Sequence, residues 1–135
     1  MKPHISAITL GVRDIQRAKQ FYQELGWPIN QDHGEWVSFT SGDGASMLGL
    51  YARAALARDA GVSSGGEGFS GVTLSYLVRS EERVAAILGE AERAGGKVVR
   101  QAEQAPWGGT SGYFADPDGN LWKVASGSGP QPFAE

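Results

Sequence analysis

The chain has 135 residues, of which 41% are hydrophobic and 20% charged, with a net charge of −3 at pH 7. It carries no basic stripe, which argues against nucleic-acid binding, and no apolar run near the roughly 20 residues that span a bilayer. The absence of cysteine excludes disulfides and thiolate chemistry. We therefore expect a cytoplasmic protein with an apolar core.

The first half predicts a strand, a helix and two further strands. Residues 5–12 (ISAITLGV) alternate and are rich in β-branched side chains, which is typical of a strand. Asp14 is placed to cap a helix that ends near Gly26. The segments EWVSFTS and SMLGLYA predict two strands around the turn SGDGA.

The second half begins after a connection of different character. Residues 53–68 predict a short helical turn and then a flexible Gly- and Ser-rich segment. The elements expected next are a strand, a helix capped by Ser80, a short strand, a loop leading into a strand, and a last strand after the turn DPDG; they lie at residues 70–78, 81–96, 97–102, 106–115 and 120–125. The polar tail is expected to be flexible.

The two halves match each other at an offset of 66 residues. AITLGVRDIQRA aligns with TLSYLVRSEERV, so that Asp14 corresponds to Ser80. The simplest interpretation is a tandem repeat of a βαβββ unit. Because one such unit is small for independent folding, we expect an α+β fold in which two modules form cup-shaped mixed sheets with helices outside. The expected parts are a first module, a linker, a second module and a flexible tail, at residues 1–55, 56–69, 70–126 and 127–135.

Three segments carry a resemblance to a known family. ITLGVRDIQRAKQFYQELGW, WGGTSGYF and ADPDGNLWKVA resemble the vicinal-oxygen-chelate superfamily, which contains glyoxalase I, bleomycin-resistance proteins, fosfomycin-resistance enzymes and extradiol dioxygenases. The resemblance covers residues 5–126. It implies paired βαβββ modules, a cup-shaped site and, in many members, a homodimer. In metal-dependent members it also implies a divalent ion held by His, Gln and Glu side chains.

The four positions that correspond to those metal ligands hold other residues here. They are Ala7, Gly49, Thr73 and Lys123. A divalent ion prefers imidazole or carboxylate donors, and a nearby ammonium group repels it. We therefore expect no metal ion and no other cofactor.

The remaining metal-binding residue types have simpler explanations. His4 should point away from the cup because its strand parity is opposite to that of Ala7. His33 lies in the polar run NQDHGE and is expected in an exposed loop. Asp116 and Asp118 are expected to cap backbone groups of the DPDG turn.

Strand alternation predicts which side chains line the cup. The candidate ligand-binding residues are Thr9, Trp36, Ser38, Met47, Tyr51, Thr73, Ser75, Trp107, Ser111, Tyr113 and Lys123. The resemblance to the fosfomycin-resistance branch supports Trp36, and Trp107 is expected in a loop at the rim. This mixture suits an apolar or planar organic ligand. The alternatives are that the aromatic residues are core and that Lys123 reaches water, or acts as a catalytic amine.

Residues of the opposite parity are expected to pack under the helices as core. They are Val37, Phe39, Leu48, Leu50, Leu74, Phe114, Trp122 and Val124, with Phe21 and Tyr22 from the first helix.

Three functions remain open from the sequence. The favoured one is a homodimer that sequesters a bulky aromatic or apolar molecule, an antibiotic above all, as bleomycin-resistance proteins capture their drug. The second is a metal-dependent glyoxalase-like lyase or isomerase, thiol transferase or dioxygenase with a remodelled site. The third is a non-metal enzyme or an accessory protein of a biosynthetic pathway, in which Tyr51, Tyr113 and Lys123 supply acid–base groups.

Overall fold

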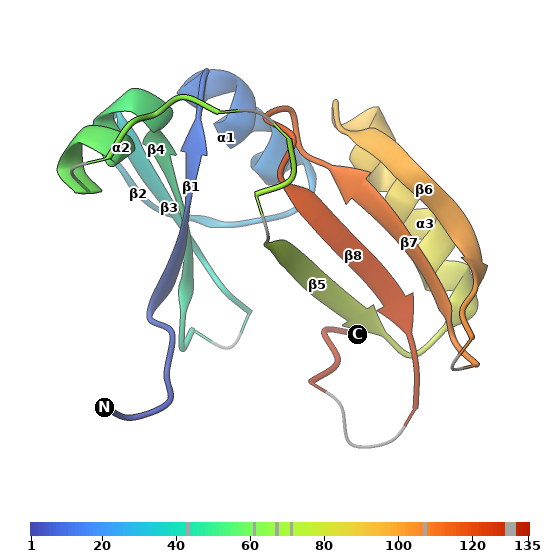
Figure 1. Cartoon of the computed structure of the whole chain (residues 1–135). Helices are drawn as coiled ribbons and strands as arrows, with labels where there is room; N and C mark the ends of the chain where they lie inside the picture. Colours follow the sequence, from blue (N-terminus) through green and yellow to red (C-terminus); the bar gives the residue numbers. More distant parts are fainter. Residues whose placement is uncertain (43, 61, 67, 71, 107, 129–131) are drawn as a thin grey trace. The chain divides into compact units, whose positions relative to one another are not determined.

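A computed structural model describes residues 1–42, 44–60, 62–66, 68–70, 72–106, 108–128 and 132–135. The chain divides into Met1–Gly68, which we call unit 1, and Phe69–Glu135, which we call unit 2. Each unit holds one four-stranded mixed sheet with an α-helix against one face (Figure 1). The expected α+β architecture of two βαβββ modules is confirmed.

Unit 1 contains β1 (Ala7–Val12), α1 (Ile15–Glu24), β2 (Ile29–Asp32), β3 (Trp36–Thr40), β4 (Met47–Ala52) and α2 (Arg53–Ala60). Its strand order is β1-β4-β3-β2, with β1 parallel to β4 and the other neighbours antiparallel. Asp14 caps α1, because its Oδ1 accepts a hydrogen bond of 3.1 Å from the Arg17 amide. Gly26, at φ +102°, takes the left-handed conformation just after the helix.

Unit 2 contains β5 (Thr73–Val78), α3 (Glu81–Arg93), β6 (Lys97–Gln104), β7 (Thr110–Ala115) and β8 (Leu121–Ser126). Its strand order, β5-β8-β7-β6, repeats that of unit 1, again with one parallel pair. Ser80 caps α3 by accepting a hydrogen bond of 3.2 Å from the Arg83 amide. Ser80 follows Asp14 by 66 residues, so both the strands and the helix caps obey the repeat seen in the sequence.

The core of each unit lies between its sheet and its long helix. The predicted core residues that are buried there are Val37, Phe39, Leu48, Leu50, Phe114, Trp122 and Val124, with Phe21 and Tyr22 from α1; Leu74 is half-buried. In unit 2, Phe114 and Trp122 stack with ring centroids 5.9 Å apart. These aromatic contacts add to the hydrophobic energy of burial.

Some elements differ from the expectation. The βαβββ repeat implies a strand between α1 and β3, but the sequence did not locate β2, because all four of its residues are exposed and the segment lacks an apolar face. α2 is an eight-residue helix rather than a single turn, and β6 extends to Gln104, beyond the expected end. His33 is exposed, as expected, although it directly follows β2.

Two register irregularities interrupt the pairing of β6 with β7. They lie between Val98 and Arg100 and between Arg100 and Glu103. At this place the two backbones approach closely, because a Cβ built on Gly112 of β7 would lie 2.9 Å from the carbonyl oxygen of Arg100 and 2.6 Å from Cδ1 of Leu88. Position 112 therefore requires a residue without a side chain.

The last described segment, residues 132–135, lies along the free edge of β5, and we call it the strap. The Ala134 amide donates to the carbonyl of Leu77 at 2.8 Å, and the Arg79 amide donates to the carbonyl of Glu135 at 3.0 Å. We expected residues 127–135 to form a flexible tail from their composition. Residues 129–131 lie outside the described residues, whereas the strap makes defined hydrogen bonds. The reason is that β5 is an edge strand with backbone groups available to it.

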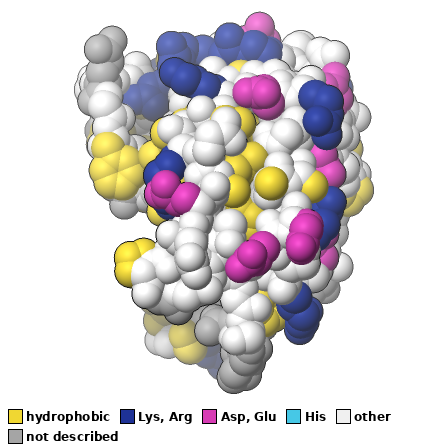
Figure 2. All heavy atoms as spheres, turned by 90° about the vertical axis from the view of Figure 1, so that its right-hand side faces the viewer, with side chains coloured by type: hydrophobic (Ala, Val, Ile, Leu, Met, Phe, Trp, Pro, Cys, Tyr) yellow, Lys and Arg dark blue, Asp and Glu magenta, His cyan; other side chains and the backbone are white. Residues whose placement is uncertain are grey.

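The surface carries both signs of charge. Figure 2 shows basic and acidic side chains around apolar ones on the face turned toward the viewer. Among the helices in the described part of the chain, none combines the length and the apolar character needed to cross a membrane.

Candidate functional site

In unit 1 the predicted ligand-binding residues share the sheet face opposite α1. Paired residues on neighbouring strands point to the same side of a sheet. Three cross-strand rows follow from the register: Ala7, Met47 and Thr40; Thr9, Gly49 and Ser38; and Gly11, Tyr51 and Trp36. All five predicted residues of this unit, Thr9, Trp36, Ser38, Met47 and Tyr51, therefore lie on one face.

Asn30 of β2 partly covers that face. Its Nδ2 donates to Oγ of Ser38 at 3.2 Å and lies 3.4 Å from Sδ of Met47. Ser38 is fully buried, so a ligand would meet the Asn30 amide before this hydroxyl. Trp36 stacks on His33 with ring centroids 5.5 Å apart.

In unit 2 a polar row crosses all four strands on the face opposite α3. Ser75 pairs with Lys123, Lys123 with Tyr113, and Tyr113 with Arg100. The Arg100 guanidinium lies 5.1 Å from the Tyr113 ring centroid, in cation–π range. It also donates to Oγ of Ser111 at 3.0 Å, which leaves Ser111 buried beneath it.

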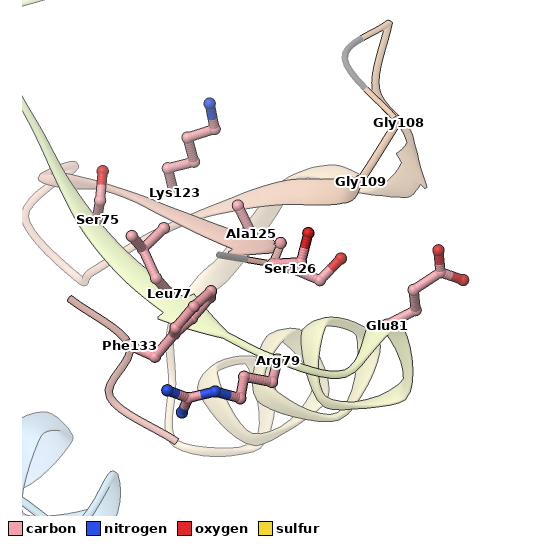
Figure 3. A pocket seen from close by; sticks show the side chains of 12 residues that line it. Ser75, Leu77, Arg79, Glu81, Gly108, Gly109, Lys123, Ala125, Ser126 and Phe133 are labelled. Carbon is pink, nitrogen blue, oxygen red and sulfur yellow. The ribbon is translucent and has the colours of Figure 1, made fainter. Parts of the chain in front are cut away.

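A cavity of about 640 Å³ opens beside this row (Figure 3). Its lining residues are Ser75, Leu77, Arg79, Glu81, Gly108, Gly109, Lys123, Ala125, Ser126, Gly127, Ser128 and Phe133. Of the predicted residues, Ser75 and Lys123 line it. Thr73, Ser111 and Tyr113 share its sheet face outside the lining, and Trp107 lies outside the described residues. This volume is typical of small-molecule sites.

The strap supplies one wall of the cavity through Phe133. The guanidinium of Arg79 lies 4.4 Å from the Phe133 ring centroid. The strap is held by Glu135, whose carboxylate accepts hydrogen bonds from the Tyr76 hydroxyl at 2.5 Å and from the Arg83 guanidinium. The strap, and with it the Phe133 ring, is thus held in place by the contacts of Glu135 with Tyr76 of β5 and Arg83 of α3.

The same contacts perturb the pKa values of the groups that hold the strap. Hydrogen bonds from Arg83 and then Tyr76 hold the pKa of the Glu135 carboxyl below its ordinary value. Burial, followed by the hydrogen bond to Glu135, raises the pKa of Tyr76 to about 12. The strap is therefore fastened by an ionised Glu135 and a neutral Tyr76 over the physiological pH range.

Two βαβββ modules, each with a mixed sheet and a long helix on one face, define a class of paired-module α+β proteins. The model of the Glyoxalase/Bleomycin resistance protein/Dioxygenase superfamily matches residues 4–124. The chain belongs to this superfamily, as the sequence motifs indicated.

Solved structures agree with this assignment. A glyoxalase-related enzyme from Fulvimarina pelagi is 31% identical, with a TM-score of 0.85, and the match covers 93% of this chain and 89% of that chain. A family enzyme from Burkholderia phytofirmans PsJN is 20% identical (TM-score 0.78; 91% and 98% covered). A lactoylglutathione lyase from Agrobacterium tumefaciens is 24% identical (TM-score 0.69; 94% and 96% covered). The last two show the fold alone. No curated protein matches the chain.

The four positions that the sequence analysis assigned to metal ligands of the superfamily carry side chains that do not fit a metal ion. Ala7 pairs with Met47, which lies two residues before Gly49, and Thr73 pairs with Leu121, which lies two residues before Lys123. The two units therefore place these positions in the same way. Their side chains are a methyl group, a hydrogen, a hydroxyl and an ammonium group, which is not a donor set for a divalent cation. Within the described residues, no group of three or more His, Cys, Asp and Glu side chains is placed to hold one.

The expected role of the DPDG turn is confirmed for Asp116. Its Oδ1 accepts from the amides of Asp118 at 2.9 Å and Asn120 at 2.8 Å. Its Oδ2 accepts from the Asn120 side chain at 2.8 Å. The turn therefore fixes the start of β8 and, through it, the position of Lys123.

The sequence analysis missed Asn30, Arg100 and Phe133. Asn30 lies on the unpredicted strand β2. Arg100 reaches the polar row because the pairing of β6 with β7 is irregular. The sequence pattern around Arg100 does not predict such a bulge. Arg79 continues the alternation of Ser75 and Leu77 and was accessible from the sequence.

Proposed function

We propose that the protein is a metal-independent small-molecule-binding protein that sequesters a bulky aromatic or apolar compound, with an antibiotic in a self-resistance role as the leading candidate. Sequestration needs a cavity of suitable size and chemistry but no reacting group. The superfamily assignment supports it, because the family description includes bleomycin-resistance proteins.

One observation carries the proposal: Lys123, at a position where metal-dependent members offer a carboxylate, lines a cavity of about 640 Å³. The ammonium group disfavours a divalent cation by charge repulsion. The cavity keeps an aromatic ring, aliphatic groups and hydroxyls in its lining, which are the groups that bind an organic molecule.

The direct test is calorimetric titration of the purified protein with a panel of aromatic antibiotics, in the presence and absence of EDTA. We expect at least one compound to bind with a Kd in the micromolar range or tighter, equally well with the chelator, and to be recovered with unchanged mass. The proposal fails if no member of a broad panel binds, if EDTA abolishes binding, or if the compound is converted.

The second candidate is a metal-dependent enzyme. It is favoured by the 31% identical structure, which is described as a glyoxalase-related enzyme. Its chemistry would need donors other than those at the four positions described above. Elemental analysis separates the two candidates: stoichiometric nickel, zinc, manganese or iron in the purified protein would establish the second and refute the first.

We further propose that the protein is a cytoplasmic homodimer, which rests on the superfamily assignment and the absence of cysteine. Size-exclusion chromatography with light scattering tests the dimer, and a monomeric mass at micromolar concentration would refute it.

A further inference from the structure

The strap contacts both faces of the unit 2 sheet at the edge of β5. Because side chains alternate along a strand, Leu77 and Arg79 point to the cavity face, whereas Tyr76 points to the face that α3 covers. Phe133 lies on the cavity face, with its ring centroid 4.4 Å from the Arg79 guanidinium and its ring beside Leu77 (Figure 3). Glu135 reaches the other face, where it contacts Tyr76. The strap therefore presents one side chain to each face.

The contacts of Glu135 suit a carboxylate. Both of its oxygens are bound by the Arg83 guanidinium, since Nε donates to Oε1 and Nη2 donates to Oε2 at 3.2 Å. Oε2 also accepts from the Tyr76 hydroxyl at 2.5 Å. Nη1 of Arg83 lies 3.5 Å from Oε1 of Glu90 on the same helix, a contact that does not involve the strap. This forked geometry matches two carboxylate oxygens and disfavours a neutral amide, which accepts at one position only.

Backbone hydrogen bonds hold the strap without regard to its side chains. The Ala134 amide donates to the carbonyl of Leu77 at 2.8 Å, and the Arg79 amide donates to the carbonyl of Glu135 at 3.0 Å. The strap is exposed apart from Phe133, which is half-buried. A segment that buries so little apolar surface detaches at low free-energy cost. The edge of β5 therefore accepts an extended chain, and two side-chain contacts select which one.

We propose that the outer edge of β5, with Arg79 and Arg83, is a binding site for an extended segment of a partner protein that carries an aromatic residue and, two positions later, an acidic residue. The strap is the built-in occupant of this site and competes with the partner segment. The inference goes beyond the proposed function and does not depend on it, since every contact that carries it joins two protein groups.

A synthetic peptide tests the inference on the full chain. The probe is acetyl-PFAE-amide, which has the sequence of the strap and a single charge, on its glutamate. The strap is weakened by the double substitution Phe133→Ala and Glu135→Gln, and circular dichroism establishes that this strap-weakened variant is folded. The peptide is titrated into isotope-labelled protein, and the chemical shifts of the Leu77 and Arg79 amides give both the Kd and the place of binding.

We expect the peptide to bind the strap-weakened variant with a Kd of about 1 mM or tighter. The wild type should bind it at least about fivefold more weakly, because its own strap competes at an effective concentration in the millimolar range. The peptides PAAE and PFAQ, which lack the ring and the charge in turn, should each bind the strap-weakened variant about fivefold or more weakly than PFAE.

Arg83→Met in the strap-weakened background should abolish the preference for PFAE over PFAQ. The matched control is Arg93→Met, because Arg93 is exposed and lies ten residues further along α3, about 15 Å away along the helix axis. The control should keep the preference. A purely structural effect of Arg83 would weaken both peptides equally, so the ratio of their Kd values isolates its contact with the carboxylate.

The inference is overturned if the strap-weakened variant does not bind PFAE at concentrations up to about ten times the expected Kd, or if it binds PFAE and PFAQ equally. It is also overturned if light scattering finds a dimer for the wild type and a monomer for the strap-weakened variant, since the occupant would then be the strap of a second copy. None of these outcomes changes the antibiotic titration, so failure of the inference and failure of the proposed function are distinguishable.

Discussion

Replacing Gly112 with alanine tests the close approach of β6, β7 and α3. The new methyl group would lie 2.6 Å from Cδ1 of Leu88 and 2.9 Å from the carbonyl oxygen of Arg100. The leucine can change rotamer, but the carbonyl belongs to the backbone of β6. To restore an ordinary contact of 3.4 Å, this backbone must move by about 0.5 Å (3.4 − 2.9).

The free-energy change combines two terms of opposite sign. Alanine restricts the unfolded chain and so contributes about 0.4–1 kcal/mol of stability, whereas overpacking costs about 1–3 kcal/mol. Because two of the three close contacts, those with the Arg100 carbonyl oxygen and the Ala102 nitrogen, involve backbone, we expect the cost to dominate, with a net loss of about 1–2 kcal/mol. For a unit of fewer than 100 residues, each kcal/mol lowers Tm by roughly 4–8 °C.

The assay is urea unfolding followed by far-ultraviolet circular dichroism, with Gly89→Ala as the matched control. Gly89 lies inside α3, and the nearest atom to its added Cβ is the flexible end of Arg93 at 3.2 Å. Alanine should stabilise this helix by up to about 1 kcal/mol. The same substitution should thus lower the midpoint at one position and raise it at the other. Equal or greater stability of Gly112→Ala would refute the packing argument.

Three further predictions concern the metal positions, the strap and the helix caps. Lys123→Glu should not create a stoichiometric nickel or zinc site by elemental analysis, since the other three positions supply no imidazole or carboxylate; tight binding would contradict this account of the donor set. Glu135→Gln should accelerate hydrogen exchange at the Arg79 amide, which the strap protects. In the wild type the Glu135 carboxylate stabilises the docked strap fully above its ordinary pKa of 4.5, and this stabilisation is lost as pH falls through the lowered pKa. The stabilisation by the Tyr76 hydroxyl is lost as pH rises from 10 toward 12. If the opening equilibrium measured by exchange did not depend on pH, this argument would be refuted. Asp14→Ala and Ser80→Ala should each cost about 0.5–2 kcal/mol in urea unfolding, whereas Asp14→Asn and Ser80→Thr retain most of the stability; a neutral alanine variant would show that the cap is not needed.

The sequence predicted the parts of the fold that local signals determine. The two helix caps are set by single side chains at the offset of 66, and the alternation of β3, β4 and β8 places the large apolar residues on the face toward the long helix. The same alternation placed Ser75 and Lys123 on one face, where they line the cavity. These predictions succeeded because the information lies within a few neighbouring residues.

The remaining features depend on contacts between residues distant in the chain. Arg100 joins the polar row only because β6 bulges against β7, and Phe133 becomes a cavity wall only because the strap finds the edge of β5. β2 is held by pairing with β3 although its residues are exposed and three of the four are polar. A pattern of hydrophobicity records none of these pairings.

The position of the strap has a consequence for the behaviour of the protein in concentrated solution. β5 is the outer strand of its sheet, and the free backbone groups of an outer strand are a template on which another polypeptide can add. The strap uses the carbonyl of Leu77 and the amide of Arg79 for this purpose within the same chain. The segment that walls the cavity thereby also protects the sheet against edge-to-edge aggregation.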